Sequence, residues 1–212
     1  MPADVANATN RVGIFLQTLW GSKRFHGYGE LPLGDLRGIF IPLSFGGIIG
    51  ALAASYAPVD YLKPVLLITM ITMSLIILVR PQVVMPEPDT LPNRVKETPS
   101  SWIMLFVSGL YGSFVQAGVG FVLIMALAGT LRYDLVKSNA LKLLCTLGFT
   151  TIALIIFVSR DQVAWVPGLL LASTMMAGAH HGVKLAIRAT ASQLKWFLFL
   201  MTLCGSVAAF YF

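Results

Sequence analysis

Residues 62–79 read LKPVLLITMITMSLIILV, an almost unbroken run of apolar side chains. A helix needs about 20 mostly apolar residues to cross the hydrocarbon core of a bilayer, and this is the clearest of about seven such runs. The others cover roughly 5–20, 36–57, 102–131, 135–158, 165–187 and 194–212. All backbone groups must pair internally in lipid, and these runs are too long for barrel strands. The sequence therefore predicts an all-α, polytopic transmembrane helix bundle of about seven spans.

The composition also points to a membrane protein. Of the 212 residues, 57% are hydrophobic and only 11% are charged, whereas a soluble domain carries about a quarter charged residues. The net charge is +6, and it has two explanations. Lys and Arg beside the membrane can set orientation and contact anionic lipid, or a basic bias can favour an anionic substrate.

Motifs for chemistry are missing from the predicted spans. The sequence contains no paired carboxylates, HExxH, GxSxG or Walker A motif there, and no Cys or His spacing typical of a metal site. We therefore expect no enzyme, no cofactor and no metal, and any active transport would use an ion gradient or the membrane potential. No basic run interleaved with aromatic residues suggests nucleic acid binding.

A polar, Pro-rich stretch at 81–100 separates two halves, 1–80 and 101–212. The halves resemble each other, because an offset of 132 positions brings Gly46–Gly50 onto Gly178–Gly182. A slightly smaller offset of 129 brings Thr9-Asn10 onto Ser138-Asn139. We interpret the halves as two homologous repeats joined by a linker, an organisation that is typical of secondary transporters.

The second half begins with a Gly-rich run, 102–131, that has no counterpart in the first half. By the same offset the counterpart would precede Met1, so we expect that the chain lacks an N-terminal segment of about 30–35 residues; the alternative is a protein that functions without it. Thirty residues exceed one straight span. The run is a tilted helix or one broken near Gly118–Gly120, with close packing through small residues as the structural alternative. A re-entrant run would make the repeats inverted, and a fully crossing run would make them parallel.

Polar residues inside these segments are candidate ligands for an anion. Asn10 and Asn139 lie at matching places and can donate hydrogen bonds without burying a full charge, or they can cap helices. Lys142 lies deep enough to balance an oxyanion, whereas we expect Arg11 to extend toward lipid headgroups. A broken helix would expose N–H groups to an anion. The predicted substrate-binding residues are Asn10, Gln116, Gly118, Gly120, Ser138, Asn139 and Lys142.

The two adjacent histidines do not predict a metal site, and the charges of the loops do not predict a membrane orientation. His180 and His181 are adjacent, so they point about 100° apart on a helix and cannot chelate one metal. We expect them to pack at an interface or near headgroups, with a proton relay as the alternative. Lys and Arg divide almost evenly between the two sides of a seven-span arrangement, so the loops do not fix its orientation.

The stretch 109–120, GLYGSFVQAGVG, with Lys137-Ser-Asn-Ala140, Trp165–Ser173 and Gly178–Gly182, resembles the TauE/SafE sulfite exporter family, also called toluene sulfonate uptake permeases. In the first half, Ala8-Thr9-Asn10 and Gly46–Ala51 fit the same pattern. The resemblance covers nearly the whole chain. The family's first Gly-rich helix has no counterpart in it. It implies a two-repeat permease of a bacterial or archaeal cytoplasmic membrane.

The sequence thus predicts a multi-pass permease of the cytoplasmic (inner) membrane. It would export or import a small anion, such as sulfite, a sulfonate or a related organic anion, by secondary transport. Its expected partners are that anion and membrane lipid, and a homo-oligomer stays open. A non-transporting membrane scaffold or assembly subunit is the alternative.

Overall fold

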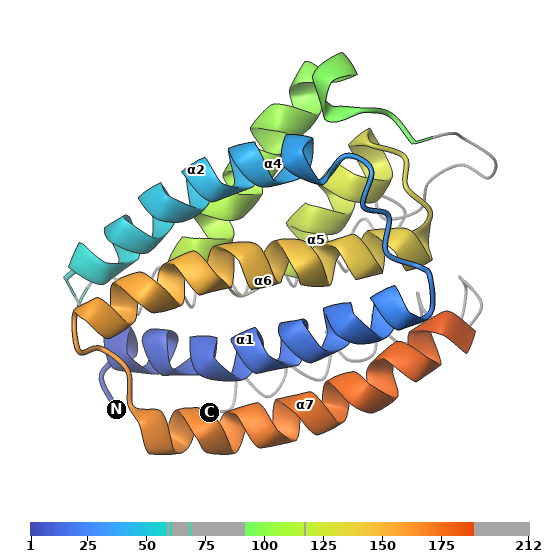
Figure 1. The fold of residues 1–212 in the computed structure, drawn as a ribbon. Helices are drawn as coiled ribbons and strands as arrows, with labels where there is room; N and C mark the ends of the chain where they lie inside the picture. Colours follow the sequence, from blue (N-terminus) through green and yellow to red (C-terminus); the bar gives the residue numbers. More distant parts are fainter. Residues whose placement is uncertain (59, 61–67, 69–91, 117, 189–212) are drawn as a thin grey trace.

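The computed structural model describes residues 1–58, 60, 68, 92–116 and 118–188, and over these residues it consists of helices and no strands (Figure 1). In chain order the elements are α1 (Ala3–Gly27), α2 (Leu36–Tyr56), the 3-10 turn η2 (Val95–Glu97), α4 (Pro99–Phe114), α5 (Val119–Ile124), the π-helical turn η3 (Met125–Thr130), α6 (Leu135–Ser159) and α7 (Trp165–Arg188). The predicted spans 62–79 and 194–212 and most of the linker lie outside the described residues.

The predicted segments agree closely with the helices that the structure describes. The bounds of α2, α6 and α7 match the expected 36–57, 135–158 and 165–187 to within one residue at each end, whereas α1 extends beyond 5–20 at both ends. Two described helices, α2 and α6, are long and apolar enough to cross a membrane. The all-α class is confirmed, while seven spans stay a prediction.

The four long helices form one layer in the view of Figure 1. The central pair is α1 and α6, with α2 on the outer side of α6 and α7 on the outer side of α1 (Figure 1). Following the chain colours, α1 and α6 run in opposite directions, as do α2 and α7. Both ends of α1 and α6 differ by the same 132 positions, Ala3 from Leu135 and Gly27 from Ser159.

The Gly-rich run is a broken helix that turns back on itself. Between α4 and α5, the left-handed φ of 69° at Gln116 and 74° at Gly118 ends one helix and redirects the chain. Near the far ends of the run, the backbone N–H of Asn93 donates to the Leu131 carbonyl at 2.9 Å. The Thr130 hydroxyl lies 3.0 Å from the Met104 sulfur. The run therefore enters and leaves at the same end of the bundle.

Three glycines let α2 and α4 pack at backbone contact. A Cβ atom added at Gly46 would meet the Phe106 carbonyl oxygen, and one at Gly50 would meet that of Leu110. Gly109 stands in the same relation to the Leu43 carbonyl. Close crossing through small residues is a common way for helices to associate in membranes. The Gly-rich run is therefore both broken and closely packed through a small residue, Gly109.

The matching glycines of α7 have no close neighbour among the described residues. Gly178 and Gly182 lie 132 positions after Gly46 and Gly50, yet a Cβ atom at either would meet no heavy atom of the described residues within 4 Å. Among the described residues, the GxxxG pattern of the first half therefore makes backbone contacts and that of the second half makes none.

This difference predicts opposite effects of the same substitution. Gly46→Ala and Gly50→Ala should destabilise the protein by about 1–3 kcal/mol, because the new methyl group overpacks against backbone. Gly178→Ala and Gly182→Ala should be neutral or stabilising by up to about 1 kcal/mol, because alanine favours helix. Thermal unfolding of the four purified variants in one detergent measures this. Equal losses in both pairs would contradict the packing.

Charged residues gather at one end of the bundle. We call the end formed by the α1–α2 connection and the start of α6 the basic end. It carries Lys23, Arg24, Arg37, Arg94, Lys96, Arg132, Lys137, Lys184 and Arg188. Among the described Lys and Arg residues, Arg160 lies at the opposite end. The expected even division is wrong over this part of the chain, because the Gly-rich run doubles back and leaves the segments after it on the other side.

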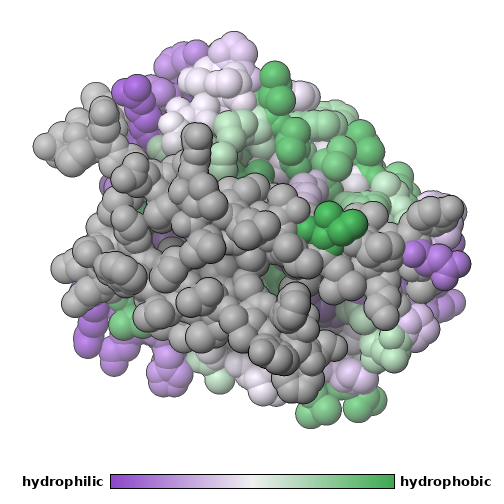
Figure 2. All heavy atoms as spheres, turned by 180° about the vertical axis from the view of Figure 1, so that it is seen from behind, coloured by the Kyte–Doolittle hydropathy of each residue, from purple (hydrophilic) through white to green (hydrophobic). Residues whose placement is uncertain are grey.

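Apolar side chains cover the outside between the two ends. Seen from behind, hydrophobic atoms gather over the face that α2 and α4 share (Figure 2). The large exposed residues there include Ile41, Phe45, Ile49, Ile103 and Val107. An exposed apolar surface of this kind fits a lipid environment.

Candidate functional site

The centre of the site is Arg11, whose side chain is fully buried on α1. Its guanidinium donates to the carbonyl oxygens of Gly112 at 2.6 Å and Ser113 at 2.7 Å, and to the Gln116 side-chain oxygen. The last carbonyls of a helix have no partner within the helix and carry its negative partial charge. Arg11 therefore caps the C-terminus of α4 from another helix.

The expectation that Arg11 extends toward lipid headgroups is wrong. Its acceptors come from residues about a hundred positions later in the chain, so the sequence around α1 gives no sign of them. The available signal was the spacing of Asn7 and Arg11, which are four residues apart and therefore share one face of a helix.

Asn7 completes this cap and was not among the predicted residues. It is 9% exposed, its amide nitrogen donates to the Phe114 carbonyl at 3.1 Å, and its oxygen lies 3.4 Å from an Arg11 nitrogen. The predicted Asn10 is half-buried instead, and no hydrogen bond joins its side chain to the residues that the structure describes. The asparagine that reaches the break is thus one helical turn earlier than expected.

A second cation approaches the break from α6. The Lys142 ammonium donates to the Asn139 oxygen at 2.7 Å, and the Asn139 amide donates to the Leu135 carbonyl at 2.9 Å. The Lys142 side chain passes Gly120, where an added Cβ would lie 3.5 Å from the lysine Cδ. Asn139 and Lys142 therefore lie together and face the start of α5.

Ser138 is placed differently from its neighbours. Its side chain is fully buried, and its hydroxyl donates to the Tyr133 carbonyl at 3.1 Å. This bond ties the start of α6 to the preceding turn, away from the break.

The two asparagine–cation pairs match each other. Asn7 and Asn139 are separated by 132 positions, the same offset that relates the ends of α1 and α6. Neither Arg11 nor Lys142 pairs with a carboxylate among the described residues. The salt bridge in this part of the chain joins Lys137 to Asp134 at 2.8 Å. Unpaired cations in an apolar interior are costly and mark functional sites, so the break between α4 and α5 is suited to an anion.

The chain matches the family model described as Sulfite exporter TauE/SafE over residues 1–209. It belongs to the TauE/SafE sulfite exporter family. Members of this family are integral membrane transporters of sulfite and related anions, which agrees with the apolar α2 and α6. No curated protein and no solved structure matches the chain.

Metal binding finds no support in this part of the TauE/SafE chain. Within the described ranges, no group of three or more His, Cys, Asp or Glu side chains lies close enough to hold an ion. His180 stacks on Trp20, with ring centroids 6.3 Å apart, in line with the packing role expected for it.

Removing the Arg11 cap should destabilise the protein. Arg11→Met leaves the Gly112 and Ser113 carbonyls without a donor, and each buried unpaired acceptor costs about 1–3 kcal/mol. We expect a loss of at least about 3 kcal/mol, and a smaller loss for Arg11→Lys, which keeps the charge but not the forked geometry. The measurement is thermal unfolding in detergent, with exposed Lys96→Met as the control. A wild-type melting temperature for Arg11→Met would rule out the cap.

Proposed function

We propose that this protein is a multi-pass inner-membrane permease that moves sulfite, a sulfonate or a related small organic anion by secondary transport. Family membership supports the transporter class and the anionic substrate. The observation that carries the proposal is the broken α4–α5 helix, with Arg11 on one side and Lys142 on the other. Neither cation has an acidic partner among the described residues.

Lys142 is the group that we assign to direct contact with the anion. An ammonium has three N–H donors, and one of them is used by Asn139. The side chain is half-buried, and its other two donors have no hydrogen-bond partner among the described residues. Charge-assisted hydrogen bonds to an oxyanion are about twice as strong as neutral ones, and Gln116, Gly118 and Gly120 lie along the same break.

Arg11 has a positioning role in this proposal. Its two terminal nitrogens donate to α4 carbonyls and to the Gln116 side chain, and its buried Nε has no partner among the described residues. It fixes where the helix ends and adds positive potential to the break. It does this without needing to touch the anion, which is why we assign it to the scaffold of the site.

We infer that the two halves form an inverted repeat. Support comes from the opposite directions of α1 and α6, from the common offset of their ends and from the re-entrant Gly-rich run. Inverted repeats with broken helices near their interface are the arrangement of many secondary transporters, in which the halves rock about a fixed site. A scaffold subunit would not need two unpaired cations beside such a break, so we favour transport.

Sulfite and small sulfonates should stabilise the purified protein selectively. Ligand at 100 times its dissociation constant adds about 2.7 kcal/mol of stability. Lys142→Met should weaken binding about tenfold or more, since a hydrogen bond to a charged group is worth about 1.5–3 kcal/mol. Thermal unfolding against sulfite, sulfonates, sulfate, carboxylates and chloride measures binding, and release of labelled sulfite from proteoliposomes measures transport.

Lys137→Met is the matched control, because Lys137 is on the same helix and its salt bridge with Asp134 is exposed. It should behave as wild type in both assays, since exposed ion pairs contribute little. A folded protein that responds to no anion, or a Lys142→Met variant that transports normally, would contradict the proposed site.

A further inference from the structure

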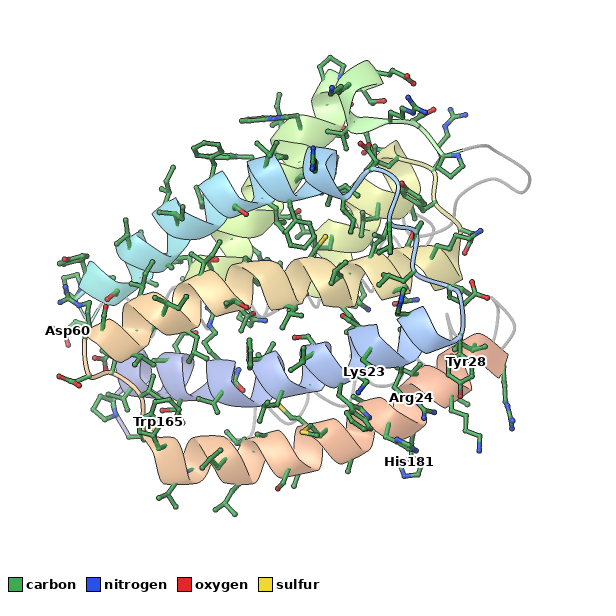
Figure 3. All side chains as sticks on the ribbon, in the orientation of Figure 1. Lys23, Arg24, Tyr28, Asp60, Trp165 and His181 are labelled. Carbon is green, nitrogen blue, oxygen red and sulfur yellow. The ribbon has the colours of Figure 1, made fainter. Side chains whose placement is uncertain are left out.

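A second basic site lies at the basic end, on the last turns of α1 and away from the broken helix. It is a pocket of about 290 Å³ lined by Trp20, Lys23, Arg24, Gly27 and Tyr28. In Figure 3 the side chains of Lys23, Arg24 and Tyr28 lie near the end of α1, on the side where α7 carries His181. The pocket therefore combines cations with aromatic rings at one end of α1, and α7 lies beside it.

The cations of this pocket are held in place by those rings. The Lys23 ammonium lies 6.0 Å from the Trp20 ring, and the Arg24 guanidinium lies 5.4 Å from the Tyr28 ring and donates to its hydroxyl at 3.0 Å. The Arg24 Nε atom is buried and has no hydrogen-bond partner among the described residues. The hydrogen-bonding capacity of Arg24 is therefore only partly used by the described residues.

The α7 side adds basic groups and no acid. His180 stacks on Trp20, and His181 meets the edge of the His180 ring at 5.3 Å, with Lys184 one turn further along α7. Among the described residues, no Asp or Glu lines the pocket. The potential in the pocket is positive, so its ligand is an anion.

The surroundings favour a lipid over a soluble anion. Leu19 is 46% exposed and Leu185 is 48% exposed, so apolar surface lies next to the pocket on both helices. Trp and Tyr at helix ends are typical of the membrane–water interface. A headgroup phosphate in the pocket would leave its acyl chains against that apolar surface.

We propose that this pocket binds the phosphate group of an anionic phospholipid, with the basic end facing the cytoplasmic leaflet. The excess of Lys and Arg at that end identifies it as the cytoplasmic side. Lys and Arg next to a membrane helix on that side attract anionic headgroups. The site is distinct from the anion site at the broken helix, and it rests on membership of an integral membrane family rather than on the proposed substrate.

Native mass spectrometry of the full chain tests this proposal, with phosphatidylglycerol and phosphatidylcholine as the probes. Phosphatidylglycerol should be retained in preference, and each lost cation should lower its affinity about fivefold. The variant Lys23→Gln/Arg24→Gln should therefore lose about 25-fold. The matched control is Arg94→Gln/Lys96→Gln, which removes the same charge from exposed residues at the same end, outside the pocket, and should keep wild-type retention.

Three outcomes would overturn the proposal. Equal losses in the two double variants would mean attraction to the basic end as a whole. Equal retention of phosphatidylcholine and phosphatidylglycerol would mean that the pocket does not select the net negative charge of an anionic lipid. Displacement of the lipid by millimolar inorganic phosphate would mean a site for a free anion. Lys23→Gln alone, at an exposed position, keeps the test informative if the double variant is unstable, and none of these results depends on sulfite transport.

Discussion

The described structure depends on the contact between Arg11 of α1 and the end of α4. A helix that stops inside a membrane leaves carbonyl groups without partners, and lipid cannot supply any. The guanidinium and the Asn7 amide provide donors to Gly112, Ser113 and Phe114. Because the cap is a cation at a helix C-terminus, the negative end of the α4 dipole also offsets part of the cost of burying the charge.

The cap has consequences for the whole bundle. With its end secured, α4 can stop after 16 residues, about 24 Å at 1.5 Å per residue, which is shorter than the hydrocarbon core of about 30 Å. The chain then turns at Gln116 and Gly118 and leaves at the end where it entered. This return puts the start of α6 beside the end of α1, and it gathers the Lys and Arg residues of the later segments at the basic end.

The two halves use a common pattern for different contacts. In one half, Gly46 and Gly50 hold α4 at backbone distance while Asn7 and Arg11 cap it. In the other, Gly178 and Gly182 meet no described residue, and Lys142 is bonded to Asn139 of its own helix. The pair whose bonds run to the end of another helix supports structure, and the pair that bonds within its own helix is the one we assign to a ligand. An internal repeat can in this way divide scaffold and binding between related residues.

The sequence by itself determined the helical class, the bounds of α2, α6 and α7 and the family, and it limited the Gly-rich run to a tilted or a broken helix. These follow from local properties: apolar runs of spanning length, and glycine where the backbone leaves the helix. Only the tertiary structure decided that Arg11 is buried, that Asn7 and not Asn10 reaches the break, and that the basic residues share one end. Each of these depends on groups distant in the chain, above all the α4 carbonyls that meet α1, and main-chain acceptors leave no trace in a sequence.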